Sequence, residues 1–264
     1  MDGLNDNVRK VDNMINTIIH GDCLEVMKDI PTGSIDAIIT DPPYGTTACK
    51  WDNVIPFDKM WEQLHRVIKK NGAIVLFGSE PFSSALRMSN IKNYKYDWIW
   101  DKRFSGSIGI AKYQPMRTTE RISIFYKKVN YFPQMIKRDK PIVNGGNKCR
   151  SDSGQLKKPK QGYKKIYTQK YPIDILTFDV RGERGLHPTQ KPVALIEYLI
   201  KTYTLENETV LDFTIGSGTT AVACINTNRN FIGIEKEKKY VDIANTRIYD
   251  ALESVRNSEY VSAN

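Results

Sequence analysis

Short apolar runs alternate with amphipathic stretches near both ends of the chain. The apolar runs predict strands at residues 17–19, 35–40, 73–77, 96–100 and 122–126. Helical spacing predicts helices between them at residues 22–28, 56–70 and 81–89, the second of these stopped by Asn71 and Gly72. The alternation resumes late in the chain, with strands expected at 210–213 and 231–235 and helices at 193–202, 218–226 and 240–254. This order predicts an α/β fold with a mostly parallel sheet and helices on both faces.

Between the two regular parts, residues 131–186 are rich in Lys, Gly, Pro and Asn and show little periodicity. They hold 13 Lys/Arg and 5 Asp/Glu, a net charge of +8, whereas residues 1–130 carry +3 and residues 187–264 carry −2. A basic insertion in a near-neutral protein suits binding to a phosphate backbone, although a solvated surface loop has the same composition. We therefore expect a disordered tail at 1–14, one half of a domain at 15–130, a basic insertion at 131–186 and the other half at 187–264.

Composition sets limits on the class of protein. The chain has 264 residues, of which 40% are hydrophobic and 26% charged, enough to bury the core of one α/β domain. No run approaches the roughly 18 apolar residues of a membrane span, and the first residues lack a signal peptide, so we expect a cytoplasmic protein with no membrane partner. The four cysteines are far apart and form no CxxC pair, and the histidines are scattered. Neither a metal site nor a disulfide framework is therefore expected.

The sequence Asp41-Pro42-Pro43-Tyr44 directly follows the strand predicted at 35–40. Open α/β sheets bind their ligands at the carboxyl ends of such strands. An exocyclic amino group on a base is a poor nucleophile because its lone pair is delocalised, and acceptors for its two N–H groups free that pair. Asp41 and the Pro42 carbonyl are suitable acceptors, and Tyr44 offers a flat face for a flipped base. Alone, the tetrapeptide is equally compatible with a rigid turn.

A second motif, residues 212–220 (DFTIGSGTT), follows another predicted strand and opens a helix. Its glycines allow close approach to a ligand, and the helix N-terminus favours a carboxylate. Asp212 is a candidate for binding an ammonium group. Glu235 ends the next strand, where an acidic side chain can bind the hydroxyls of a ribose. Such a unit is also compatible with the dinucleotide site of a dehydrogenase.

The two motifs together resemble those of the DNA amino-methyltransferases, which pair DPPY with a DPFxGSGTT cofactor loop. Residues 187–192 (HPTQKP) resemble the element that precedes this loop, Gly21 and Asp22 resemble the acidic turn beside the cofactor adenine, and residues 119–128 resemble the late β-hairpin. The resemblance covers most of the chain. DPPY precedes the cofactor loop and the basic insertion lies between them, which is the circularly permuted order of the β class. Phe213 departs from the pattern, because the family usually has proline there.

The resemblance implies a Rossmann-like, S-adenosylmethionine-dependent methyltransferase fold with a mostly parallel, seven-stranded sheet, circularly permuted around a target-recognition region at 131–186. It implies transfer of a methyl group from S-adenosylmethionine to the N6 amino group of adenine at a specific site in duplex DNA, by base flipping and direct displacement. The implied catalytic residues are Asp41, Pro42, Pro43 and Tyr44. The implied cofactor residues are Asp22, Asp41, Lys191, Asp212, Phe213, Gly216, Ser217, Gly218, Thr219 and Glu235. The DNA-binding candidates are Lys148, Arg150, Lys157, Lys158, Lys160, Lys164 and Lys165.

Alternatives remain open. Cytosine-acting members of the family more often have Ser where Asp41 stands, which favours adenine over the N4 amino group of cytosine. An RNA or protein methyltransferase more often has Asn at this position and the unpermuted order, and a catalytically silent DNA-binding protein would not need both motifs. No Cys follows a Pro, which argues against ring-carbon cytosine chemistry. A homodimer, a cognate restriction endonuclease, the recognised DNA site and a bacterial or phage origin are compatible with the resemblance and not specified by the sequence.

Overall fold

The structure is a computed structural model that describes residues 13–46, 52–105, 108–145, 164–180 and 190–262. Its contacts divide the chain into two units. Unit 1 comprises Met1–Phe132 and Asp174–Asn264, and unit 2 is Pro133–Ile173.

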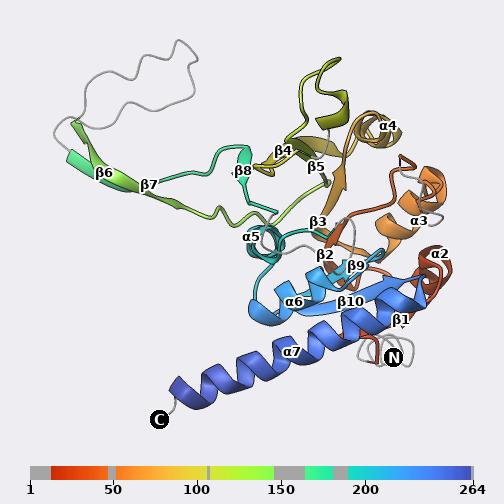
Figure 1. Cartoon of the computed structure of the whole chain (residues 1–264). Coiled ribbons are helices and arrows are strands. Elements are labelled where there is room, and N and C mark those ends of the chain that lie inside the picture. Colours follow the sequence, from red (N-terminus) through yellow and green to blue (C-terminus); the bar gives the residue numbers. More distant parts are fainter. Residues whose placement is uncertain (1–12, 47–51, 106–107, 146–163, 181–189, 263–264) are drawn as a thin grey trace. The chain divides into compact units, whose positions relative to one another are not determined.

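Unit 1 is built on an eight-stranded sheet. From one edge to the other the strands are β1 (Thr17–His20), β10 (Asn230–Glu235), β9 (Thr209–Asp212), β2 (Ile35–Thr40), β3 (Ile68–Gly78), β5 (Thr119–Phe125), β4 (Tyr94–Asp101) and β8 (Ile175–Thr177). Only β5 runs antiparallel to its neighbours. The late strands β9 and β10 lie between the early strands β1 and β2, so the two halves of the chain interleave in one sheet (Figure 1). The predicted mostly parallel α/β fold is confirmed, with β8 as a strand that was not predicted.

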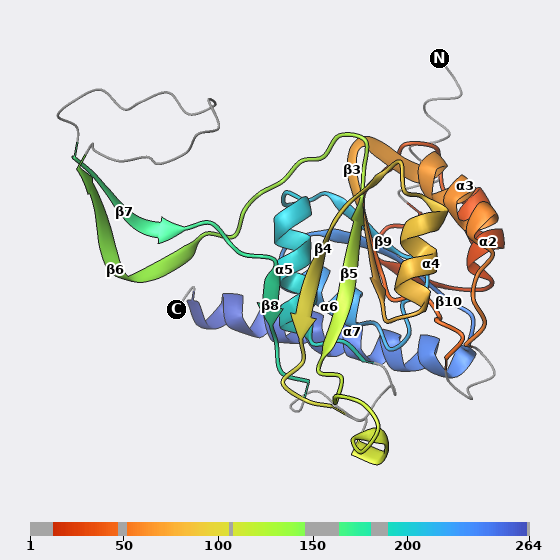
Figure 2. The same cartoon turned by 90° about the horizontal axis from the view of Figure 1, so that it is seen from above.

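Helices cover both faces of this sheet (Figures 1 and 2). Successive side chains of a strand point to opposite faces. Ile39 accordingly packs in the cluster that contains α5 (Val193–Tyr203) and α6 (Thr219–Asn226). Ile38 packs in the cluster of α3 (Phe57–Val67) and α4 (Phe82–Ser89), to which the short α2 (Cys23–Val26) and η1 (Met27–Asp29) also contribute. All six residues of β2 are buried. Because helices cover both faces of the sheet, the sequence of β2 does not alternate between apolar and polar residues. The last helix, α7 (Lys238–Ser262), contacts α6.

One predicted boundary is wrong. The helix expected to run to residue 70 ends at Val67, and the next residues already belong to β3. Gly72 lies inside that strand and does not stop a helix. A Cβ added to Gly72 would lie 2.6 Å from the Asp36 carbonyl oxygen, so glycine is required there by the close approach of the β2 backbone.

Residues 131–186, expected to be a basic insertion with little periodicity, contain strands that were not predicted. Residues Ile175–Thr177 form β8 and pair in parallel with β4, Ile99 opposite Ile175. Leu176 is buried in the core, and the Phe178 carbonyl accepts a hydrogen bond of 2.9 Å from Trp100 Nε1. A strand of three residues is too short to show a period in the sequence.

Unit 2 contains an antiparallel pair, β6 (Ile136–Gly145) and β7 (Lys164–Lys170), which we call the β6–β7 ribbon. Its register shifts between Lys137 and Ile142. The side chains of Ile142, Val143 and Ile166 are 46–62% exposed. Because the described side chains of the ribbon are buried on neither face, nothing there requires the apolar alternation by which strands are found in a sequence.

The first residues are only partly described. Residues 1–12 lie outside the described part, so the disordered tail stays a prediction. Met14, assigned to that tail, packs against the core, and its carbonyl accepts a hydrogen bond of 2.6 Å from the Thr17 hydroxyl. No helix in the described ranges is long and apolar enough to cross a membrane.

Candidate active site

The two sequence motifs meet because β2 and β9 are parallel neighbours, with Ala37 opposite Val210. Both strands therefore end at the same edge of the sheet. Thr40 Oγ1 donates to Asp212 Oδ1 at 2.7 Å and accepts from the Phe213 N–H at 3.0 Å. In return, the Thr214 hydroxyl donates to the Asp41 carbonyl at 3.0 Å. These bonds fasten DPPY to the glycine-rich loop although about 170 residues separate them.

The glycine-rich loop has a conformation that its glycines permit. Gly216 and Gly218 have φ of 54° and 83°, in the left-handed region. A Cβ on Gly218 would lie 2.8 Å from Ala244 Cβ, so α7 leaves no room for a side chain there. Arg247 of α7 donates to the Ser217 carbonyl at 2.8 Å and so fixes the loop just before α6.

Two acidic side chains at the ends of β9 and β10 accept hydrogen bonds from nearby backbone and hydroxyl groups. Asp212 accepts from the hydroxyls of Thr40 and Thr220 and from the Thr214 N–H, at 2.6–3.2 Å. Burial raises the pKa of Asp212 to about 6, and these donors only partly oppose the rise. Glu235 accepts from the Gly216 N–H at 2.9 Å and the Glu237 N–H at 2.7 Å. Both predicted cofactor acids thus also shape the loop, which the sequence did not indicate.

A cavity of about 390 Å³ opens at this edge of the sheet. It is lined by all four DPPY residues and by every predicted cofactor residue except Gly218. Among these, Asp22 is the N-cap of α2 and accepts from the Leu24 N–H at 3.0 Å. Phe77 and Ile234 line the cavity too, but apolar residues at strand ends carry no signature that separates them from the core.

The acidic group of DPPY is enclosed by charged and aromatic side chains. Asp41 Oδ1 accepts from the Tyr44 hydroxyl, and Oδ2 accepts from Lys191 Nζ. Lys191 Nζ also lies 3.7 Å from Glu120 Oε2, and Glu120 Oε1 accepts from Lys102 Nζ at 2.8 Å. Glu120 and Lys102 were not predicted, since a single Glu at a strand start and a single Lys in a loop have no distinguishing pattern.

These contacts shift the pKa values of Asp41, Lys191 and Tyr44. Burial raises the pKa of Asp41, and the Lys191 ammonium opposes that rise. Burial acts to lower the pKa of Lys191, but the carboxylates of Asp41 and Glu120 outweigh it, so the pKa is raised and the lysine is an ammonium ion. Burial, with the neighbouring Asp41, raises the pKa of Tyr44 well above its usual value, which keeps the phenol a hydrogen-bond donor. The Lys191 ammonium therefore favours the ionised form of Asp41, against the effect of burial.

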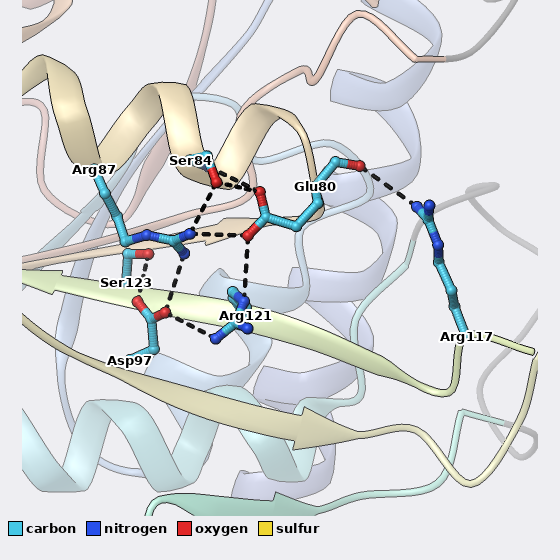
Figure 3. Close-up of polar contacts among 7 residues, drawn as sticks. All are labelled: Glu80, Ser84, Arg87, Asp97, Arg117, Arg121 and Ser123. Atoms are coloured by element: carbon cyan, nitrogen blue, oxygen red, sulfur yellow. Dashed lines mark hydrogen bonds and ion pairs between the residues drawn. The ribbon is translucent and has the colours of Figure 1, made fainter. Parts of the chain in front are cut away.

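The Tyr44 ring is supported from behind. It stacks on Phe82 at the start of α4, with ring centroids 5.0 Å apart and planes at 29°. An ion network holds α4 to the sheet (Figure 3): Arg87 bonds Glu80 at 2.8 Å and Asp97 at 3.1 Å. Arg121, on β5, reaches the same two acids. The position of Phe82, and with it one face of Tyr44, is therefore tied to β4 and β5.

Asp52 closes the turn after DPPY. Its two carboxylate oxygens accept from the N–H groups of Gly45 and Thr46 at 2.8 and 2.9 Å. Gly45 has a φ of 68°, which the turn requires of it.

Most of the predicted DNA-binding residues lie in a part of the chain that the structure does not describe. Lys148, Arg150, Lys157, Lys158 and Lys160 lie outside the described residues, and Lys164 and Lys165 belong to β7 without described side chains. Within the described ranges, no group of three or more His, Cys, Asp or Glu is arranged to hold a metal ion.

Comparisons with known proteins agree with this geometry. Residues 35–246 match the N6/N4 methyltransferase family model, described as "DNA methylase". The DNA adenine methyltransferase YhdJ of Escherichia coli (strain K12) is 31% identical over 89% of this chain and 83% of its own length. The type II methyltransferase M.HinfI of Haemophilus influenzae is 28% identical over 96% of this chain and 73% of its own.

Solved structures give the same result for the fold. The crystal structure of the M1.HpyAVI–SAM complex is 29% identical and superposes with a TM-score of 0.60, covering 88% of this chain and 98% of that one. The cytosine-N4-specific PvuII DNA methyltransferase superposes equally well, with a TM-score of 0.60 over 91% of this chain and 92% of its own, but at 17% identity it is informative about the fold alone.

Proposed function

The chain belongs to the N6/N4 DNA methylase family, and on that premise we propose that it transfers a methyl group from S-adenosylmethionine to the N6 amino group of adenine in duplex DNA. One observation carries the proposal: Asp41, a partly buried carboxyl group held between Tyr44 and Lys191, lines the same cavity as Glu235 and the glycine-rich loop. The cavity therefore contains both an acceptor for an amino group and residues suited to bind a nucleoside.

The residues of the cavity fit the cofactor. A volume of about 390 Å³ lies within the range of about 300–1,000 Å³ that small-molecule sites occupy. We assign the ribose to Glu235 at the end of β10 and the amino-acid part to the loop around Gly216, beside the start of α6. When bound, S-adenosylmethionine supplies a methyl group that its sulfonium centre has already activated. No metal is needed for that transfer.

The DPPY residues supply the acceptor side of the reaction. Asp41 and the Pro42 carbonyl accept the two N–H groups of the target amine, which localises its lone pair on nitrogen. Tyr44, backed by Phe82, offers its other face to the flipped base. Orientation of the amine toward the methyl group then supplies most of the rate enhancement.

Adenine is favoured over cytosine by Asp41 and by the name of YhdJ, a DNA adenine methyltransferase. The test is mass spectrometry of nucleosides from duplex DNA incubated with the protein and S-adenosylmethionine. We expect N6-methyladenine, and N4-methylcytosine as the sole product would overturn the assignment. Competition between duplex DNA and RNA for labelled methyl groups tests the nucleic acid, and preference for RNA would contradict it.

Two segments are suited to the DNA. The β6–β7 ribbon, to which we assign target recognition as part of 131–186, carries exposed Lys137, Lys140 and Lys170, and a two-stranded ribbon is a shape that the major groove admits. Residues 102–118 carry four basic and no acidic residues. They connect β4 to β5 at the sheet edge where β2 ends, since β4 runs in the direction of β2. Deleting 140–170 should weaken DNA binding and make it less dependent on salt. Unchanged affinity would refute the assignment of target recognition to the β6–β7 ribbon.

Partners and compartment complete the proposal. M.HinfI is named a type II methyltransferase, and we propose by analogy that this chain acts in the cytoplasm alongside a cognate restriction endonuclease. We also propose a homodimer. Light scattering in solution tests the dimer, and a monomer at every concentration would contradict it.

A further inference from the structure

Four charged side chains of alternating sign lead from the start of the β4–β5 connection to Asp41. Lys102 bonds Glu120 Oε1 at 2.8 Å, Glu120 Oε2 lies 3.7 Å from Lys191 Nζ, and Lys191 bonds Asp41. The Lys191 side chain is 9% exposed and that of Glu120 is 16% exposed. The chain of charges is therefore largely shielded from water and passes from the loop to the reaction centre.

Glu120 lies next to the Lys191 ammonium but forms no hydrogen bond with it. Its Oε2 atom is buried and accepts no hydrogen bond from any residue in the described ranges. A distance of 3.7 Å is an ion pair and is longer than a hydrogen bond. Because an ammonium has three donors, a small movement of Lys191 would bring it into hydrogen-bonding range of this oxygen.

We propose that Glu120 is a positioning residue for methyl transfer, which holds the Lys191 ammonium beside Asp41 and receives it when the target amino group bonds Asp41. This inference rests on the proposed function, because the amino group belongs to that reaction. During transfer, the amino nitrogen bonds the methyl carbon and the carbon–sulfur bond breaks with its electron pair going to sulfur. One amino proton passes to Asp41.

The need for a second acceptor follows from competition at Asp41. Lys191 opposes the rise in the pKa of Asp41, and it also bonds Oδ2, one of the two oxygens available to the amino group. Without Glu120, an ammonium displaced from Asp41 would also lose the carboxylate that lies 3.7 Å from it, and moving a largely buried ammonium away from its counter-charges has a high cost in free energy. With Glu120 present, the displaced ammonium exchanges its bond to the Asp41 carboxylate for a bond to the Glu120 carboxylate.

The charges around Asp41 give opposite predictions for two substitutions. Lys191 lowers the pKa of Asp41 and Glu120 raises it. Lys191→Met should therefore shift the acid limb of the kcat profile to higher pH, whereas Glu120→Gln should shift it to lower pH. Other titratable groups act on this pair and are common to both variants; among the described residues they include Tyr44 beside Asp41, Asp212 on β9, and Lys102 beside Glu120.

The experiment measures kcat, KM for duplex DNA and cofactor affinity against pH. For Glu120→Gln we expect kcat to fall about tenfold to a hundredfold, the effect of one charge-assisted hydrogen bond, with KM and cofactor affinity near those of the wild type. The matched control is Glu197→Gln on α5, because Glu197 also forms a 3.7 Å ion pair with a lysine, Lys201. It should change none of these quantities.

A conservative variant separates positioning from folding. Glu120→Asp keeps the charge and should return the acid limb toward that of the wild type and recover part of kcat, even where Glu120→Gln lowers stability. A wild-type kcat and acid limb in Glu120→Gln, or limb shifts of the same sign in Glu120→Gln and Lys191→Met, would overturn the inference. A wild-type protein that fails to methylate DNA would instead overturn the proposed function.

Discussion

Replacing Gly218 by alanine should lower the free energy of unfolding of the protein and weaken cofactor binding. Gly218 has a φ of 83°, and an added Cβ would lie 2.8 Å from Ala244 Cβ and 3.0 Å from Ala244 Cα. The left-handed conformation costs a side chain about 1–2 kcal/mol, and the clash, which includes backbone, adds about 1–3 kcal/mol of overpacking. The control is Gly33→Ala, since Gly33 has a φ of 67° with nothing within 4 Å of its added Cβ.

The two variants therefore share the conformational cost and differ in the clash. Urea unfolding should give Gly218→Ala a free energy of unfolding about 1–3 kcal/mol below that of Gly33→Ala. Calorimetric titration with S-adenosylmethionine should show a loss of affinity for Gly218→Ala alone, because relief of the clash moves the loop that lines the cavity. Equal unfolding free energies for the two variants would refute the close packing of α7 against the loop, and unchanged cofactor affinity would refute the assignment of the loop.

Three further results are expected. Asp41→Ala should lower kcat by about 10²–10⁴-fold with cofactor binding largely intact, and activity near that of the wild type in a labelled-methyl assay would exclude Asp41 as the acceptor. Since burial raises the pKa of Asp212 from 3.8 to about 6, its contribution to stability is full below 3.8 and is lost as pH rises through about 6. Asp212→Asn should remove about 2–3 kcal/mol of that pH dependence between pH 4 and 7 in urea unfolding, and an unchanged profile would contradict it. Arg103→Ala with Lys112→Ala should weaken DNA binding and reduce the salt slope by about 0.9 per lost phosphate contact, while Lys238→Ala on α7 should not; equal effects would rule out a specific contact.

The sequence predicted the parts of the fold whose burial leaves a periodic trace. The runs at 35–40 and 73–77 are buried on both faces and appear as β2 and most of β3. The β6–β7 ribbon was missed because its described side chains are exposed on both faces, so no apolar period is selected. Gly72 was misread since a glycine required by a neighbouring backbone looks the same in a sequence as one that stops a helix.

The site divides in the same way. DPPY and the glycine-rich loop were found because their chemistry depends on short runs with fixed spacing, and the cavity joins them. Glu120, Lys102 and Phe82 act through contacts between segments far apart in the chain, which leave no local pattern. The sequence also gave no sign that Asp212 and Glu235 hold backbone N–H and hydroxyl groups of the protein itself.

The order of the two halves along the chain does not matter to the geometry of the site. What the site requires is that the carboxyl ends of β2 and β9 be adjacent and parallel, which fixes the bonds of Thr40 to Asp212 and of Thr214 to Asp41. Either order of halves satisfies that condition, since each half contributes whole strands and the connection between them leaves the sheet after β5. That connection contains unit 2, Pro133–Ile173, whose described residues contribute no strand to the sheet, so we expect unit 2 to tolerate changes in length and charge without effect on the strand pair on which Asp41 depends.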